Sequence, residues 1–275
     1  MQNILSIDLD SVAHMDVDNQ ETSAQKKKKD NGHLIKAADC ILDTLERKNT
    51  KATFFIVAEV YDWHPELIEK IQEKGHEIGF HSYSHTRLLN KDILIDELKK
   101  SSKFIKKFKP RGFRAPQIFL TADSFSILEK HGFEYDSSSY GNFKDVRKIG
   151  KILEIPVSFI SYSKNKQDTD FPKPLNFRLI KNGIPIGSGY FIGLFGKSNF
   201  SFIRRLNKTS PYVMFIHPWQ ILKPNLSKSY YLKEALKNPL IAPYYINRKK
   251  VFESMLDKFE FTSFKDYIKN NLVDF

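Results

Sequence analysis

Residue types that ligate metals or move protons occur at four places in the chain, each time where an apolar run stops. These residues are Asp8 and Asp10 after "NILSI", His81 and His85 in "GFHSYSH", Arg114 in "GFRAP", and His217 after "YVMFI". Two neutral imidazoles and one carboxylate are a common ligand set for a catalytic divalent metal with open positions. His81, His85 and one of the two aspartates therefore form a candidate metal site.

The other members of this group have chemistry that complements a metal. Side chains alternate along a strand, so Asp8 and Asp10 are expected on one side, where one can bind metal and the other can act as base for a water that the metal activates. His217 is a candidate general acid, and Arg114 is a candidate charge partner for the free aspartate. An H-x-x-x-H pair alone is a weak signal, even if a helical turn puts both rings on one face. The shared position at strand ends favours a functional site over separate structural roles.

The elements that must position these residues alternate between apolar strands and amphipathic helices. We expect strands near 3–7, 52–57, 77–80, 112–116, 151–160 and 212–219, and helices near 34–48, 64–75, 91–108, 121–132, 230–238 and 248–259. Such alternation predicts a parallel sheet. Repeated units without a glycine-rich dinucleotide turn favour a (β/α) barrel, in which functional groups gather at the C-terminal ends of the strands. The stretch between 160 and 212 is expected to be irregular, and the lysine run 25–32 to be a mobile loop.

Composition limits the class of protein. Of 275 residues, 41% are hydrophobic and 23 are Phe, which predicts an aromatic-rich core. The single cysteine, Cys40, excludes an internal disulfide and a cysteine-based zinc site. The N-terminus lacks a basic, apolar leader pattern, so we expect a cytoplasmic protein with at most peripheral membrane contact. The net charge of +12 suits an acidic partner, but a lysine-rich solvated surface explains it more simply, and we expect no nucleic-acid partner.

The ordered motifs "SIDLD", "HSYSH", "FRAP" and "IHPW", together with "ATFFIV", "GFEYDSSSY" and "GSGYF", resemble a known family. They are similar to the NodB-homology polysaccharide deacetylases, which are like carbohydrate esterase family 4, over about residues 3–220. The likeness is strongest to the exopolysaccharide and cytoplasmic peptidoglycan-deacetylase-like branch, where D-x-D replaces D-D. It implies one catalytic domain over 1–275, with a core over about 3–220 and a helical closing segment over about 221–275. The implied fold is a distorted (β/α) barrel of about seven parallel strands with outer helices.

The resemblance also assigns roles to individual residues. It implies that Asp8 is the base, that Arg114 orients it, and that His217 is the acid. It implies one divalent ion, zinc by default with cobalt, manganese, nickel or iron as alternatives, on Asp10, His81 and His85. The implied substrate-binding residues are Pro116, Ser188, Gly189, Tyr190 and Trp219. The pattern does not choose between Asp136 and Glu154 as the carboxylate that tunes His217, and His14 can approach either the metal or the substrate.

The activity implied by the resemblance is metal-dependent removal of an acetyl group from an N-acetyl amino sugar, during synthesis of surface polysaccharide or cell-envelope glycan. The substrate can be free or linked to a nucleotide or lipid, and a homo-oligomer is compatible with the sequence. Two alternatives stay open. One is a deformylase or other amidase acting on a lipid-linked sugar, and the other is an inactive sugar-binding homologue.

Overall fold

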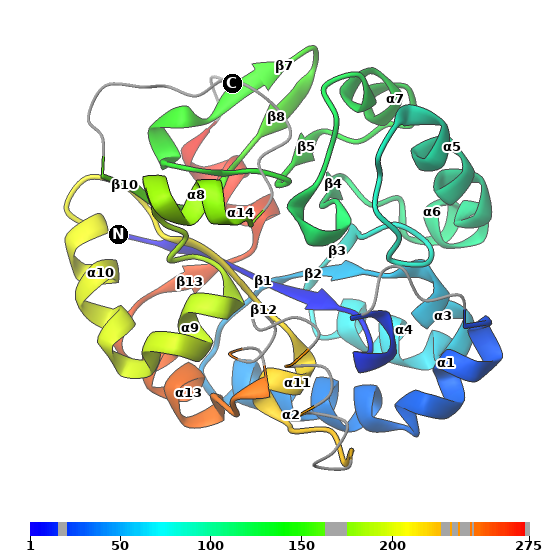
Figure 1. Cartoon of the computed structure of the whole chain (residues 1–275), viewed down its shortest axis with the longest axis horizontal. Helices are drawn as coiled ribbons and strands as arrows, with labels where there is room; N and C mark the ends of the chain where they lie inside the picture. The colour runs from blue at the N-terminus through cyan, green and yellow to red at the C-terminus, as the bar shows by residue number, and fades with distance from the viewer. Residues whose placement is uncertain are drawn as a thin grey trace.

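A curved, mainly parallel β-sheet forms the centre of the molecule (Figure 1). The computed structural model describes residues 1–15, 21–162, 175–226 and 245–272, with the single residues 232, 236 and 243. The strands follow the spatial order β12 (Val213–Ile216), β1 (Asn3–Leu9), β2 (Thr53–Ile56), β3 (Glu77–Phe80), β4 (Gly112–Phe113), β5 (Tyr135–Asp136), β8 (Ile152–Glu154) and β7 (Arg147–Ile149). From β12 to β8 every neighbouring pair is parallel, and only β7 runs antiparallel, against β8. The predicted distorted barrel of about seven parallel strands is confirmed.

The core strands are buried on both faces, as parallel strands covered by helices must be. All seven residues of β1 are buried, and so are all four of β2. Aromatic rings fill the space between the sheet and its helices. Phe80 stacks on Phe133 at 5.8 Å between ring centroids and contacts Phe113 at 5.7 Å. The expected aromatic-rich core is therefore present.

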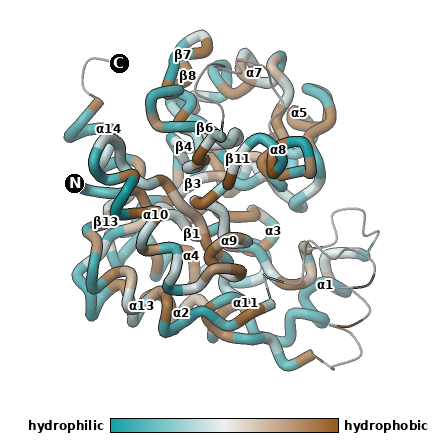
Figure 2. The backbone as a smooth tube through the Cα atoms, turned by 60° about the vertical axis from the view of Figure 1, so that its left-hand side comes forward, coloured by the Kyte–Doolittle hydropathy of each residue, from teal (hydrophilic) through white to brown (hydrophobic). Residues whose placement is uncertain are grey.

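Amphipathic helices cover the outside of the sheet, with their apolar residues inward. They include α2 (His33–Arg47), α3 (Ala58–Trp63), α4 (Pro65–Glu73), α7 (Ser124–Lys130) and α13 (Lys249–Lys258). In α2 the buried residues Leu34, Ala38, Ile41, Leu42 and Leu45 recur at helical spacing, which fixes the face that packs on the sheet. Figure 2 shows the hydrophobic colouring concentrated along the central strands, with much of the helical exterior hydrophilic.

Two predicted elements are interrupted. The helix expected over 91–108 is two helices, α5 (Lys91–Lys100) and α6 (Ser102–Phe108). At the junction Ser101 Oγ donates to the Glu97 carbonyl at 2.8 Å, a side-chain bond that competes with the helical pattern. The strand expected over 151–160 is three short strands, β8, β9 (Val157–Ser158) and β10 (Ile160–Ser161). Pro156 has no N–H to continue the ladder after β8.

Two segments predicted to be irregular are helical instead. The lysine run belongs to α1 (Ser23–Asp30), which begins at a capping box in which Thr22 and Gln25 exchange hydrogen bonds. The stretch between 160 and 212 contains α8 (Phe177–Asn182), β11 (Gly183–Ile184), α9 (Gly189–Phe195) and α10 (Asn199–Leu206). The helix expected over 230–238 falls outside the described residues.

The C-terminal segment contributes to the sheet as well as covering it. After α13, strand β13 (Phe261–Thr262) pairs in parallel with the start of β1, and α14 (Phe264–Asn271) follows. The sequence pattern predicted only helices here. Across the ranges that the structure describes, no helix combines the length and apolar character needed to cross a bilayer.

Candidate active site

Strand register brings the predicted site residues together at one end of the sheet. Ile7 lies opposite Ile216, so the residues that follow them, Asp8 and His217, share one level. Phe80 lies opposite Phe113, so His81 and Arg114 come directly after paired positions. Strands β12, β1, β2, β3 and β4 are consecutive in the sheet, and this edge is their C-terminal end. The prediction that the polar clusters converge is confirmed as geometry.

A buried ion pair lies at the centre of this group. Arg114 Nη1 donates to Asp8 Oδ1 at 2.7 Å, with Arg114 0% and Asp8 3% exposed. Arg114 also donates to Ser6 Oγ at 2.7 Å, to Ser137 Oγ at 2.9 Å and to the Ser137 carbonyl at 3.1 Å. Its guanidinium lies over the Phe55 ring at 4.3 Å. Bonds on several sides fix the guanidinium plane, so Arg114 can orient Asp8.

The two histidines of "HSYSH" approach each other through a left-handed bend. Ser82 and His85 both have positive φ, 64° and 63°, and Ser82 Oγ accepts from the His85 N–H at 3.0 Å. Left-handed backbone at two non-glycine residues is strained and needs support from its surroundings. Glu97 of α5 provides it by accepting from the N–H groups of Tyr83 and Ser84 at 2.9 and 2.8 Å. The two rings end 5.0 Å apart between centroids.

Backbone carbonyls fix which nitrogen of each ring is available. His81 Nδ1 donates to the Arg114 carbonyl at 2.6 Å, and His85 Nδ1 donates to the His14 carbonyl at 2.9 Å. These contacts leave Nε2 of each neutral ring available to a ligand, and His85 Nε2 lies 3.5 Å from Asp10 Oδ2. Burial lowers the pKa of His81, with the charge of Asp8 acting against it. Burial and the neighbouring His81 and His14 rings lower the pKa of His85 well below its usual value.

Asp10 is a buried carboxylate with one unpartnered oxygen in the described part of the chain. It is 1% exposed, and its Oδ1 has no hydrogen-bond partner among the described residues. Burial, with the adjacent charge of Asp8, raises the pKa of Asp10 well above the usual value for an aspartate. An uncompensated carboxylate beside two imidazole nitrogens is a favourable environment for a cation.

The donor set of Asp10, His81 and His85 fits a divalent metal. Within the described ranges, no group of three His, Cys, Asp or Glu side chains is close enough together to hold a metal ion as it is. The fit depends instead on the orphaned oxygen of Asp10 and on two rings held with Nε2 available. One carboxylate and two imidazoles suit zinc and also the neighbouring transition metals.

His217 is held differently from the other two histidines. Its ring stacks on Trp219 at 4.5 Å between centroids, and its Nδ1 lies 3.4 Å from Gln220 Oε1. Burial lowers the pKa of His217 to about 4, and the charge of Asp8 offsets only part of that effect. The ring is therefore neutral at neutral pH in this structure.

The predicted substrate-binding residues fall into two places. Pro116 begins a 3-10 turn (Pro116–Ile118) two residues after Arg114, and Gln117 and Ile118 there have positive φ. Ser188 caps α9 by accepting from the Tyr190 N–H at 3.2 Å. These positions border the strand ends that carry the polar group.

The segment 188–190 is joined to His217 through Gln220, a residue that the sequence interpretation missed. Gln220 Nε2 donates to the Gly189 carbonyl at 2.7 Å, and its Oε1 accepts from the His217 N–H at 3.1 Å. A Cβ at Gly189 would lie 2.4 Å from Gln220 Oε1, so a larger residue here would displace the Gln220 side chain from these contacts. Trp219 is only 2% exposed and is better described as the platform under His217 than as an open sugar contact.

The two carboxylates considered as partners of His217 are engaged elsewhere. Asp136 accepts from the N–H and hydroxyl of Ser138 at 2.9 and 2.6 Å, and Glu154 accepts from Ser139 Oγ. Burial raises the pKa of both, and the Asp136 charge raises that of Glu154 further, well above its usual value. Both carboxyls are buried and bonded to the serines that follow β5, and no contact of either with His217 is present among the described residues.

His14 approaches the metal site indirectly. Its ring nitrogens face Ser11 and Glu59, and its backbone carbonyl accepts from a predicted ligand, His85. The sequence interpretation also missed Glu59, Glu97 and Ser137, which support the site from neighbouring elements. The serine run "DSSS" after β5 and the His217–Gln220 spacing were the available signals.

Comparison with known proteins finds a family that this chain is similar to. Residues 30–135 match the family model described as polysaccharide deacetylase. The chain is similar to a peptidoglycan-N-acetylglucosamine deacetylase of Bacillus cereus, 33% identical over 92 residues, which are 32% of this chain and 34% of that protein. It is also similar to a peptidoglycan-N-acetylglucosamine deacetylase of Listeria monocytogenes, 39% identical over 59 residues, 22% of this chain and 13% of that protein. These matches span about a third or less of the relatives' length.

Solved structures show the same fold. A "probable polysaccharide deacetylase" from Pseudomonas aeruginosa PAO1 superimposes with a TM-score of 0.59 at 16% identity, covering 98% of this chain and 91% of that one. Puue allantoinase gives the same TM-score and identity, over 98% and 90%. At this identity the likeness concerns the fold. The sequence likeness, over residues 30–135, is to the polysaccharide deacetylases.

Proposed function

We propose that this chain is a metal-dependent hydrolase that removes the acetyl group from an N-acetyl amino sugar of a cell-envelope or surface glycan. The observation that carries the proposal is the buried Arg114–Asp8 pair beside Asp10, whose Oδ1 has no partner among the described residues. The arrangement supports separate roles for the two carboxylates. Asp8 is paired with Arg114, whereas Asp10 has no cationic side chain bound to it in the part of the chain that the structure describes and is available to a metal ion. The family match supports the acetylated amino sugar as substrate.

In this proposal Asp10, His81 and His85 hold one divalent ion, with zinc as the default. When bound, such an ion supplies Lewis-acid polarisation of the substrate carbonyl and lowers the pKa of water. Asp8, oriented by Arg114 through Oδ1, accepts a proton from the attacking water through its remaining oxygen. The water oxygen bonds to the acetyl carbon, the C–N bond breaks, and acetate and a free amine are the products.

His217 is the proposed donor to the departing nitrogen. Because burial lowers its pKa to about 4, the ring is neutral at neutral pH and must take up a proton from solvent before it can donate one to the departing nitrogen. The nearby charge of Asp8 favours the protonated ring. The Trp219 stack and the Gln220 contact hold the imidazole plane while the proton moves.

The test is acetate release from N-acetylglucosamine oligomers and from peptidoglycan fragments by protein stripped of metal and then reloaded with zinc. We expect acetate and free amine in equal amounts, dependent on zinc and lost in His81→Ala. His131→Ala is the matched control, because this exposed histidine contacts only its own helix, at the Ile127 carbonyl. Absence of acetate release from every acetylated sugar at full zinc occupancy would contradict the proposal.

A further inference from the structure

The His14 ring is a buried, fully bonded group next to the proposed metal site. It is 1% exposed, its Nδ1 accepts from the Ser11 N–H at 3.0 Å, and its Nε2 donates to Glu59 Oε2 at 2.9 Å. It also stacks on Trp63, with 5.1 Å between centroids and 12° between planes. Burial lowers the pKa of His14, which agrees with a neutral ring whose two nitrogens have opposite hydrogen-bonding roles.

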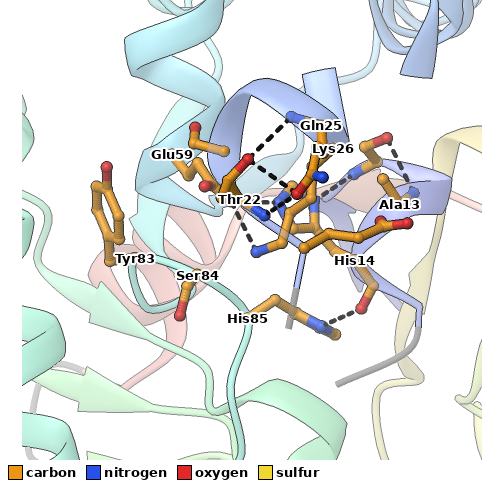
Figure 3. Close-up of polar contacts among 12 residues, drawn as sticks. Ala13, His14, Thr22, Gln25, Lys26, Glu59, Tyr83, Ser84 and His85 are labelled. Atoms are coloured by element: carbon orange, nitrogen blue, oxygen red, sulfur yellow. Dashed lines mark hydrogen bonds and ion pairs between the residues drawn. The ribbon is translucent and has the colours of Figure 1, made fainter. Parts of the chain in front are cut away.

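The backbone carbonyl of the same residue orients a proposed metal ligand. His85 Nδ1 donates to the His14 carbonyl at 2.9 Å, as Figure 3 shows. This bond keeps the proton of His85 on Nδ1 and turns Nε2 toward Asp10. Ser11 and Glu59 hold the two ring nitrogens of His14, and Trp63 packs on one face of the ring. These contacts fix residue 14, and so they also fix the position of its backbone carbonyl.

Helix α1 completes the support. Lys26 is 7% exposed, and its Nζ lies 3.1 Å from Glu59 Oε2, the same oxygen that contacts His14 (Figure 3). Trp63 Nε1 donates to Ser23 Oγ at 2.8 Å, so the platform under His14 is also tied to α1. Burial acts to raise the pKa of Glu59, but the hydrogen bond from His14 and the charge of Lys26 lower it below its usual value. The carboxylate therefore accepts from both partners as an anion.

We propose that His14 is a positioning residue for the metal site: Glu59, held by Lys26 of the lysine-rich helix, fixes the His14 ring, and the His14 carbonyl fixes His85. The proposal rests on the ligand role assigned to His85 in the proposed function. The proposal assigns a structural role to Lys26 of the lysine run in α1, whereas composition alone suggests that these lysines only form a solvated surface. Partners behind a ligating histidine commonly change metal affinity about 10- to 100-fold when they are removed.

The experiment compares variants that separate shape from hydrogen bonding. His14→Phe keeps an aromatic ring on Trp63 but loses both ring hydrogen bonds. Glu59→Gln keeps an acceptor oxygen for His14, whereas Glu59→Ala removes it. Zinc affinity is measured by calorimetric titration of the whole chain, and melting temperature is measured on zinc-free protein. We expect zinc binding about 10- to 100-fold weaker in His14→Phe and Glu59→Ala, and within about threefold of wild type in Glu59→Gln.

A second readout needs neither metal nor activity. Nitrogen-15 NMR of the zinc-free protein reports which ring nitrogen of His85 carries the proton. Wild type and Glu59→Gln should show the Nδ1–H form, and His14→Phe should show a mixture of tautomers. Lys26→Met, the mildest change, should weaken zinc binding less than Glu59→Ala.

The outcomes separate this inference from the proposed function. Wild-type zinc affinity and an unchanged His85 tautomer in His14→Phe would overturn the positioning role and leave the proposed function intact. Equal zinc loss in Glu59→Gln and Glu59→Ala would also overturn it, because hydrogen bonding to His14 would then not matter. Wild-type protein that binds no zinc would overturn both. Zinc-binding protein without deacetylase activity would refute the function alone.

Discussion

Asp8→Asn tests the buried ion pair most directly, because it removes a charge and almost no volume. Arg114 Nη1 now donates to Asp8 Oδ1 at 2.7 Å, and an asparagine oxygen can still accept there. What disappears is the counter-charge of a guanidinium that is 0% exposed. Removing one partner of a buried pair typically costs about 3–5 kcal/mol, and the retained hydrogen bond is worth about 1 kcal/mol. We expect the free energy of unfolding to fall by about 2–4 kcal/mol.

Three measurements on the same preparation follow the consequences of Asp8→Asn. Urea unfolding of zinc-free protein gives the stability change, zinc titration gives the affinity, and acetate release gives turnover. Zinc affinity should stay within about threefold of wild type, while turnover should fall by about 10²-fold or more, the usual range for loss of a general base. Ser137→Ala is the matched control. It removes the Arg114 contact at 2.9 Å without touching Asp8. It should therefore lower the free energy of unfolding by about 1 kcal/mol and leave turnover nearly unchanged.

Two results would refute this reasoning about Asp8. If Asp8→Asn unfolds at the same urea concentration as wild type, Arg114 does not depend on Asp8 for its charge compensation. If Asp8→Asn loses zinc while keeping a wild-type-like fold, Asp8 is a ligand, and its role is exchanged with that of Asp10.

Two further predictions concern histidines. His217→Ala should lower turnover about 10²-fold or more on an N-acetyl sugar, because its leaving nitrogen must be protonated, and should lower it less on an activated acetyl ester. Equal losses of turnover on the two substrates at full zinc occupancy would mean that His217 only positions the substrate. Burial lowers the pKa of His76 to about 4 from its usual 6.5, so the unfolded chain binds a proton that the folded chain does not. The free energy of unfolding should therefore fall as pH drops from about 6.5 toward 4. Urea unfolding at pH 7 and at pH 5 should show a smaller fall for His76→Gln than for wild type. An equal fall in the two proteins would contradict this role of His76.

The convergence of the site could be predicted because barrel topology converts sequence order into spatial position. Asp8 and Arg114 are far apart in sequence, yet each follows a strand that ends at the same edge of the sheet. Apolar runs identify the strands, and a polar residue at the end of each run marks the edge. This reasoning needs no knowledge of side-chain conformation, so it located the cluster but not its contacts.

The local geometry could not be predicted, because it depends on partners distant in sequence. Nothing within "HSYSH" predicts its left-handed bend, which Glu97 stabilises by accepting from the backbone of Tyr83 and Ser84. Helix α1 has a hydrophilic sequence typical of a loop. Lys26 and Ser23 join it to Glu59 and Trp63 of α3. No pattern within 25–32 reports those partners.

The stability of the zinc-free protein should show how much the buried Asp10 carboxylate destabilises the fold. Its carboxylate is 1% exposed, has an unbonded oxygen among the described residues and lies beside the charge of Asp8, so the zinc-free fold carries an unfavourable electrostatic term. Zinc at about 100 times its dissociation constant should stabilise the wild type by about 2.7 kcal/mol. Asp10→Asn should invert the order. It should be more stable than wild type without zinc, because a buried charge is gone, and it should gain little when zinc is added. Thermal unfolding of both proteins with zinc and with chelator gives the four values needed. A zinc-free Asp10→Asn protein that melts below wild type would show that the carboxylate stabilises the fold through protein contacts, and the metal would not be needed to explain its burial.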